Sequence, residues 1–271
     1  MMRSLLLVVL LLVIPSIAVG KRAASRTPMQ SAAVVGVVVV GTVTDIDKDP
    51  LVTTSAPGVE DKISFTVATV KITDAIRGLK TETHLKVGFI PNARTPLNLA
   101  EKQDYLLFLT KHHSDNFYVL NFMSPPVALT ADTKATVEQV KSVGKILADP
   151  AKALKVEKAE DKAFAAMVLI MQYRSQSESG VEQTTEAVPL EESQTILQAM
   201  GAIDWTTTPQ VGGFELMQAF YQLGIVENDG WKMPAIKPGE QAVAVLHKTF
   251  NEWLSGAGAK YQIQKFVPKM K

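Results

Sequence analysis

Three aspartates alternate along one short stretch, at Asp45, Asp47 and Asp49. Carboxylates spaced in this way open the calcium-binding loop of an EF-hand, in which a glycine and a later glutamate must follow. Pro50 stands at the glycine position and Ala56 at the glutamate position, so the sequence excludes an EF-hand. A looser calcium site and ordinary turn chemistry both stay open, because aspartate also favours turns.

Four histidines are the other candidates for metal binding or proton transfer: His84, His112, His113 and His247. His112 and His113 are adjacent, and adjacent side chains of a β-strand point to opposite faces of the sheet. The chain has no His-Glu-x-x-His pair and no cysteine, so the patterns typical of a zinc site are missing. We therefore expect no metal and no cofactor. The candidate ligand-binding residues are Asp45, Asp47, Asp49, His112 and His113.

The sequence also lacks the glycine patterns that hold nucleotides or expose a serine nucleophile. Neither G-x-G-x-x-G nor G-x-x-x-x-G-K-[ST] occurs, so both kinds of phosphate cradle are absent. No G-x-S-x-G elbow is present. Composition alone leaves open a serine–histidine–aspartate triad from distant parts of the chain, but these absences favour a protein that is not an enzyme.

Composition and charge narrow the class of protein further. The 271 residues are 46% hydrophobic and 20% charged, which is typical of a globular chain and not of a disordered one. Lysine and arginine number 28 against 27 aspartates and glutamates, so the basic excess of nucleic-acid-binding proteins is missing. Without cysteine the protein forms no disulfide bond and carries no lipid on an N-terminal cysteine.

The first twenty residues have the pattern of a secretory signal peptide. Arg3 precedes an unbroken apolar run from Leu5 to Ile14, and Ala18-Val19-Gly20 has the small-x-small form of a cleavage site. The apolar stretch of about 15 residues is shorter than the roughly 20 that span a bilayer. We predict cleavage after Gly20 and export to the periplasm, the cell surface or the medium. An uncleaved segment would instead hold the protein at the membrane.

After a linker over 21–31, the segment 32–127 is expected to form a domain of short β-strands. Alternating and β-branched residues predict five strands, and the stretch 47–58 after the first is rich in turn residues. Five strands with little helix predict a small closed or nearly closed barrel, because closure removes exposed edges. The strands are expected over 34–46, 64–76, 85–90, 105–109 and 117–122, and the apolar stretch 32–40 is also interpreted as strand.

Three apolar segments of this region are similar to a module of secreted bacterial proteins. They are Val39-Val40-Gly41-Thr42-Val43, the stretch from Val70-Lys71-Ile72 to Arg77-Gly78, and Tyr105-Leu106-Leu107-Phe108-Leu109. Together they resemble the OB-type barrel of netrin and metalloproteinase-inhibitor (TIMP-like) domains over residues 33–125. The usual glycine before the last strand is missing, since Lys102 and Gln103 stand there. The inhibitors act through an N-terminal cysteine that this chain lacks, so the resemblance implies a fold and not an activity.

From Thr130 onward the apolar period changes from two to about 3.6, which predicts an α-helical domain over 128–271 and an α+β protein overall. Proline at helix starts and glycine at helix ends mark the bounds of its helices. Its three tryptophans are expected to build its core. The first helix carries Val137, Val140, Gly144 and Leu147 on one face. Further helices are expected over 151–173, 189–201, 214–223 and 240–254, with a short strand over 261–267.

Charge is sorted along this second half. Nine acidic residues and no lysine or arginine lie between Ser175 and Trp231, whereas seven lysines and two glutamates follow. We expect a solvated acidic loop over 175–187 whose charge the basic tail balances, because surface charges usually solvate. A surface for cations or for a basic partner is the alternative.

The sequence leaves three hypotheses for function. The leading one is an exported, non-enzymatic binding module for an unidentified protein or envelope component. Its barrel face and the loop 47–60 would make the contact, because OB-type barrels bind along their sheet face and loops. The second is a hydrolase with an unrecognised site at the junction of the domains, where pockets often form. The third is a structural envelope protein that packs with copies of itself.

Overall fold

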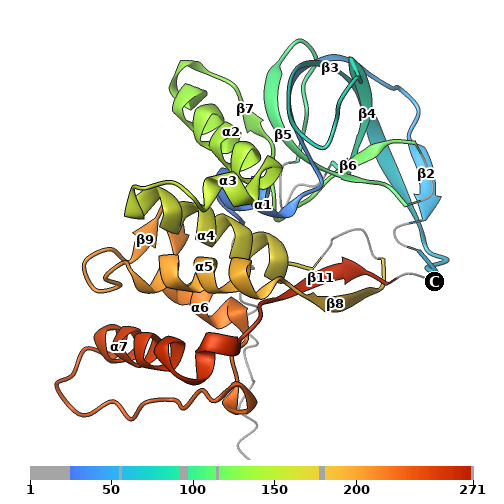
Figure 1. Ribbon diagram of the computed structural model, residues 1–271. Coiled ribbons are helices and arrows are strands. Elements are labelled where there is room, and N and C mark those ends of the chain that lie inside the picture. Colours follow the sequence, from blue (N-terminus) through green and yellow to red (C-terminus); the bar gives the residue numbers. More distant parts are fainter. Residues whose placement is uncertain (1–24, 55–56, 92–96, 114–115, 177–180, 270–271) are drawn as a thin grey trace, which may run out of the picture.

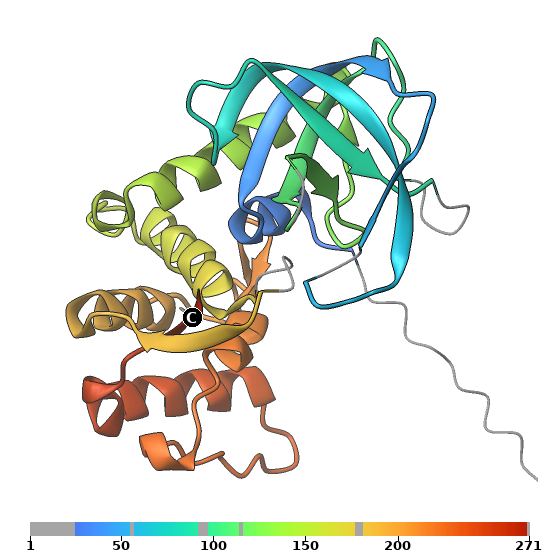
Figure 2. The same cartoon turned by 90° about the vertical axis from the view of Figure 1, so that its right-hand side faces the viewer.

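The computed structural model describes residues 25–54, 57–91, 97–113, 116–176 and 181–269. A curved sheet from the first half of the chain lies against a group of helices from the second half (Figures 1 and 2). The predicted α+β class is confirmed. The predicted signal segment over 1–20 lies outside the described residues. Within the described ranges, no helix combines the length and the apolar content needed to cross a membrane.

Seven strands form the sheet, and five of them follow one another in a ring of pairings. β1 pairs antiparallel with both β3 and β5, β3 pairs with β4, and β5 pairs with β6. β4 and β6 complete the ring as a parallel pair, while β2 adds to β3 and β7 adds to β5. The strands are β1 (Val37–Ile46), β2 (Leu51–Thr54), β3 (Lys62–Arg77), β4 (His84–Phe89), β5 (Asp104–Lys111), β6 (Tyr118–Leu120) and β7 (Val127–Ala128).

Each of the five predicted strands has a counterpart in this sheet, but β2 was not predicted. It lies within the stretch 47–58, where prolines, glycine and aspartates indicate turns. β3 begins at Lys62, earlier than the expected 64, and the residues of β2 pair with its first four residues. The partner strand thus supplies the hydrogen bonds that make 51–54 extended.

Strands β1 and β5 are buried on both faces. In β1, Val38 faces the helices while Val39 faces the interior of the curved sheet. In β5, Leu106 and Phe108 face the helices while Leu107 faces the interior. Because successive side chains of a strand alternate between faces, a strand covered on both sides must be apolar throughout. This double burial accounts for the unbroken apolar runs in both segments.

Helix α1 (Pro28–Val34) replaces part of two sequence predictions. Residues 28–31 were expected in a linker and 32–34 in a strand, and both expectations are wrong at these positions. The helix starts with a capping box, in which Thr27 Oγ1 accepts from the Gln30 amide and Gln30 Oε1 accepts from the Thr27 amide. Pro28 at the first helical position adds to the preference for a helix start.

The end of β3 holds the helices against the sheet. Arg77 Nη1 donates to the carbonyl oxygens of Ala32 and Ala33, at 2.8 and 3.1 Å, and so satisfies acceptors at the C-terminal end of α1. Burial lowers the pKa of Arg77. Gly144 of helix α2 (Lys134–Ala148) packs on the neighbouring residue, since a Cβ atom at this glycine would lie 2.8 Å from Ile76 Cγ2.

The second half contains six α-helices in the described ranges, and the predicted helix over 151–173 is two helices instead of one. Leu154 is buried in the helical core, and the chain turns there. The second of the two helices then begins with Glu160 and Asp161 in its first turn, where carboxylates favour a helix start. The helices are α2, α3 (Pro150–Ala153), α4 (Ala159–Arg174), α5 (Leu190–Gly201), α6 (Leu216–Leu223) and α7 (Ala242–Ser255).

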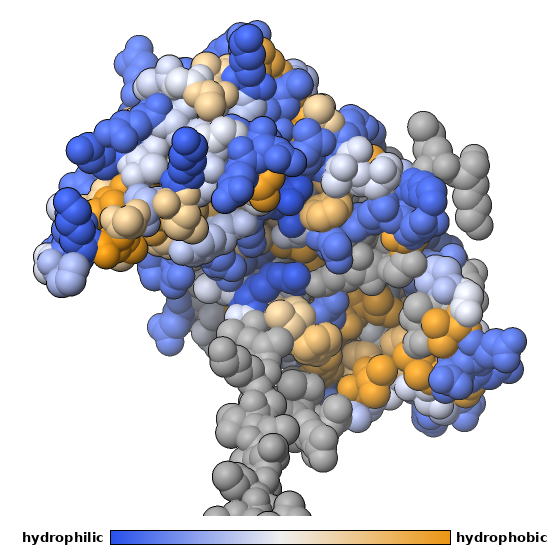
Figure 3. Space-filling model, turned by 90° about the horizontal axis from the view of Figure 1, so that it is seen from below, coloured by the Kyte–Doolittle hydropathy of each residue, from blue (hydrophilic) through white to orange (hydrophobic). Residues whose placement is uncertain are grey.

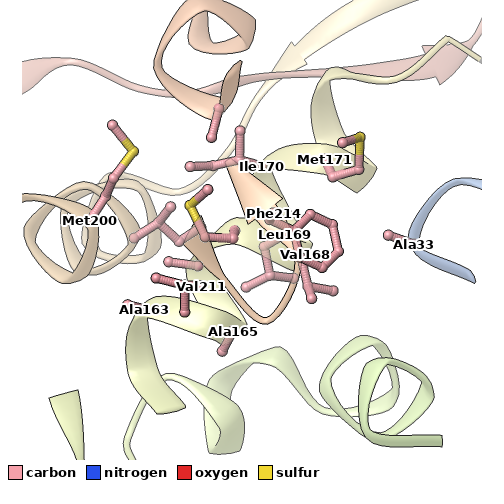
Figure 4. Close-up of a cluster of buried hydrophobic side chains, with 14 of the residues drawn as sticks. Ala33, Ala163, Ala165, Val168, Leu169, Ile170, Met171, Met200, Val211 and Phe214 are labelled. Carbon is pink, nitrogen blue, oxygen red and sulfur yellow. The ribbon is translucent and has the colours of Figure 1, made fainter. Parts of the chain in front are cut away.

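Helix α4 is the centre of the helical core. Residues 165–171 are all buried, as the apolar character on all its faces predicts. Figure 4 shows Leu169 and Ile170 of α4 between Met200 of α5 and Phe214, with Ala33 of α1 at the edge of the cluster. The three tryptophans, Trp205, Trp231 and Trp253, are buried in the same core, which confirms their predicted role.

Short strands complete the helical half, and one of them contradicts the expected acidic loop. β9 (Gln210–Val211) and β10 (Phe214–Glu215) form a small hairpin before α6. β8 (Gln183–Ala187) lies in the segment predicted to be a solvated loop and pairs antiparallel with β11 (Gln264–Pro268). The basic tail does balance acidic charge, because Lys265 and Lys269 form ion pairs with Glu186 and Glu182. The expectation of a loop is therefore wrong at 183–187, although the side chains of this strand are mostly exposed, as expected.

We predict that Arg77→Ala lowers the free energy of unfolding by about 1.5–3 kcal/mol, because two charge-assisted hydrogen bonds to α1 are lost. Urea denaturation measures the change. Lys71→Ala on the same strand is the control, since this exposed side chain should change stability by less than about 0.5 kcal/mol. Equal stability of the two variants would contradict the role of Arg77.

The raised pKa of Tyr261 makes the free energy of unfolding depend on pH in the alkaline range. Its hydroxyl donates to the carbonyl oxygen of Leu223 at 2.9 Å, and burial, followed by the charge of Asp229, raises its pKa to about 12. The phenol therefore keeps its proton in the folded chain at a pH where the unfolded chain loses it. This contribution to stability is complete below pH 10 and is lost as the pH rises from 10 towards 12.

We expect Tyr261→Phe to make the loss of stability above pH 10 less steep than in the unchanged protein. Urea midpoints measured between pH 9 and pH 11.5 give the two slopes. Tyr221→Phe, which changes an exposed phenol, should leave the slope as it is. The assignment is wrong if Tyr261→Phe and the unchanged protein lose stability in parallel.

Candidate functional site

Two open depressions adjoin on the outer surface of the sheet, beside the turn after β1. The first has a volume of about 360 Å³ and the second about 420 Å³, and Lys86 and Asn116 line both. We call the two together the groove. The first is lined by Asp47, Asp49, Pro50, Leu51, Val67, Lys86, Asn116 and Phe117, and the second by Thr69, Glu82, His84, Leu85, Lys86, Lys111, Asn116 and Tyr118.

An ion pair lies at the centre of the groove. On β4, Leu85 and Val87 are buried and Lys86 between them is exposed, as the alternation of a strand requires. Lys86 Nζ reaches Asp47 Oδ1 at 2.8 Å and Oδ2 at 3.0 Å. Both side chains are over a third exposed, so this pair adds little to stability. Its charges stay accessible to a ligand.

The two adjacent histidines turn towards the same residue of β2. β5 ends at Lys111, so His112 and His113 lie outside the strand and its alternation does not separate them. His112 Nε2 donates to the carbonyl oxygen of Thr54 at 3.1 Å, and His113 Nε2 lies 3.0 Å from Thr54 Oγ1. The two ring centroids are 4.3 Å apart. The expectation of opposite faces therefore does not apply.

Phe117 separates His112 from the groove. The buried His112 ring stacks on the Phe117 ring at 4.5 Å, and Phe65 meets Phe117 edge-on at 5.5 Å. Gly88 leaves the space for this ring, since a Cβ atom at Gly88 would lie 2.5 Å from Phe117 Cε2. The stacked aromatic rings form a packed wall behind the first depression.

The structure brings only part of the predicted site together. Asp47 and Asp49 line the groove, His112 supports its wall, and Asp45 and His113 do not line either depression. Asp45 is exposed on β1, where it pairs with Thr69. Among the described residues, no three histidine, aspartate or glutamate side chains gather as a metal would require. A loose calcium site at these aspartates therefore gains no support.

The groove also contains residues that the sequence analysis missed. Lys86 had a signal, because a lysine between two apolar residues of a predicted strand must lie on its exposed face. Phe117 gave no such signal, since its place depends on the space above Gly88 and on the His112 ring. The role of Thr54 depends on β2, which was not predicted.

Apolar side chains and one arginine pack at the described junction of sheet and helices. Its buried side chains include Val38, Leu106 and Phe108, and Arg77 is bonded to main-chain oxygens there. The histidines 112 and 113 bond to β2 on the sheet. The hydrolase hypothesis therefore finds no supporting observation at the described junction.

Comparison with known proteins does not assign this chain to a family. No protein-family model matches it, and a search of curated proteins finds no relative. Function must therefore be argued from the groove and from the elements that position it.

Gly88 offers a direct test of how the wall of the groove is built. We predict that Gly88→Ala lowers the free energy of unfolding by about 1–3 kcal/mol, because the added methyl group must displace the packed Phe117 ring. Gly36→Ala is the matched control, since no atom lies within 4 Å of a Cβ at that position. Its effect should stay below about 1 kcal/mol. Urea unfolding of both variants measures the difference, and a neutral Gly88→Ala would contradict the packing described.

Proposed function

We propose that this protein is an exported, non-enzymatic binding module whose sheet is an OB-type barrel and whose groove receives the partner. One observation carries the proposal: two adjoining depressions extend along β3, β4 and β6, beside the turn that follows β1. The residues shared by the two depressions, Lys86 and Asn116, make the groove continuous. This open, continuous form favours an extended polymer segment over a small molecule enclosed on all sides.

Support for the barrel comes from the strand pairings. Five strands form a ring in which β1 has two antiparallel neighbours and the only parallel pair among the described strands is β4 with β6. OB-type barrels are partly open five-stranded barrels that bind along one sheet face and its loops. The likeness to netrin and TIMP-like modules concerns this fold alone, since the chain has no cysteine for their inhibitory chemistry.

The chemistry of the groove indicates what its partner must offer. Asp47 and Asp49 place carboxylates at one end, where Lys86 pairs with Asp47, and Lys111 and Glu82 place charges of both signs at the other. Val67 and Phe117 form a buried apolar wall at the acidic end, and Leu51 contributes exposed apolar surface there. A segment that combines apolar and basic side chains therefore fits the acidic end, because complementary charges determine register and partner choice.

A pull-down from the native envelope fraction tests this function. We expect Asp49→Lys to reduce capture of the partner at least about tenfold, because the new charge opposes a basic segment in the groove. Glu157→Lys makes the same change of charge at an exposed position between α3 and α4 and should leave capture intact. Capture that is equal for both variants, and unchanged by alanine substitutions through the loop 47–60, would exclude the groove as the contact.

A further inference from the structure

An exposed segment extends from the helical half at the end of the molecule opposite the sheet (Figures 1 and 2). It comprises residues 232–239 between the 3-10 helix η2 (Glu227–Asp229) and α7, and we call it the lysine loop. Trp231 anchors its start, since this buried ring packs on Phe220 at 5.1 Å and on Trp253 at 6.1 Å. Beyond this anchor nearly every residue is exposed.

The side chains of the lysine loop have no evident role in the fold. Met233 is 63% exposed and Ile236 is 47% exposed, and Lys232 and Lys237 flank them. Within the described ranges, neither lysine forms an ion pair with a carboxylate. Pro234 and Pro238 restrict the backbone, so little conformational freedom is left to lose on docking. Figure 3 views this end of the molecule, where apolar patches lie among hydrophilic residues.

The acidic end of the groove offers the complementary chemistry. Leu51 and Val52 of β2 are 37% and 55% exposed, and Leu51 lines the groove beside Asp49. Glu60 and Asp61, at the opposite end of β2 from Asp49, are exposed as well, and exposed lysines stand next to both sites, at Lys48 and Lys62. None of these three carboxylates forms an ion pair with a described basic side chain. The exposed Leu51 beside the carboxylate of Asp49 thus lies at one end of the molecule, and the exposed Met233 and Ile236 between two lysines lie at the other.

We propose that the lysine loop of one copy docks into the acidic end of the groove of a second copy. The inference rests on the proposed binding function of the groove and names a partner for it. Met233 and Ile236 would cover Leu51, and Lys232 or Lys237 would meet Asp49. Because the two surfaces differ and lie at opposite ends, the contact is head-to-tail and can repeat along a chain of copies.

Sedimentation velocity of the purified full chain over a range of concentrations tests the docking. We expect association that grows with concentration, and we expect Met233→Ser/Ile236→Ser and Asp49→Lys each to weaken it at least about tenfold. Phe122→Ser removes an apolar side chain that is 58% exposed elsewhere on the surface, and this control should associate like the unchanged protein. Glu157→Lys is the charge-matched control for Asp49→Lys.

Mixing the two defective variants gives the decisive measurement. A copy with the altered loop keeps an intact groove, and a copy with Asp49→Lys keeps an intact loop, so one good contact can form between them. The mixture should therefore form a one-to-one dimer and grow no further, while each variant alone stays monomeric. Non-specific association, or association through the N-terminal apolar run, would not stop at a dimer and would not require mixing of the two variants.

Two results would overturn the proposal. One is an unchanged protein that stays monomeric at every concentration, and the other is association that persists equally in both variants. The proposed function fails separately, because it requires that Asp49→Lys lose an envelope partner in the pull-down. Loss of that partner by a strictly monomeric protein would keep the binding function and exclude the self-docking.

Discussion

The double burial of β1 and β5 is the constraint on which the rest of the structure depends. These neighbouring strands face the sheet interior with residues such as Val39 and Leu107 and the helices with Val38 and Phe108. Such strands need cover on both sides, and the helical half supplies it on the outer side. The helices therefore occupy the side of β1 and β5, and the outer surface of β3, β4 and β6 is left for solvent and for the groove.

The sheet and the helices lie close together at the end of β3. Glycine leaves the space for this contact, and the buried cation of Arg77 bonds across it. Gly78 follows β3 with φ of +82°, and a Cβ there would lie 2.2 Å from the carbonyl oxygen of Gly36, so no other residue fits without movement of the backbone. Arg77 next to it spans from the sheet to the end of α1 and pairs with carbonyl oxygens in place of a carboxylate. A cation satisfied in this way ties two elements together without needing a second buried charge.

The sequence predicted elements where one local signal dominated and missed them where distant partners decided. The apolar run in β5 predicts a buried strand, and the tryptophans predict a packed helical core; both are buried in the structure. Helix α1 was missed although Thr27, Pro28 and Gln30 carry a helix-start pattern, because the β-branched run that follows outweighed it. No local pattern predicts β2 or β8, because their extended form comes from pairing with β3 and β11. In the groove, Asp47 and Asp49 could be found from their spacing, whereas Phe117 depends on contacts with Gly88 and His112.

The groove combines a closely packed wall with a rim of exposed charges. Behind it the rings pack closely, with centroids 4.5 Å apart for His112 and Phe117 and 5.5 Å apart for Phe65 and Phe117. The rim charges behave differently, because Lys86 and Asp47 are exposed and their pairing costs little to break. A partner with its own charges can replace either side of that pair.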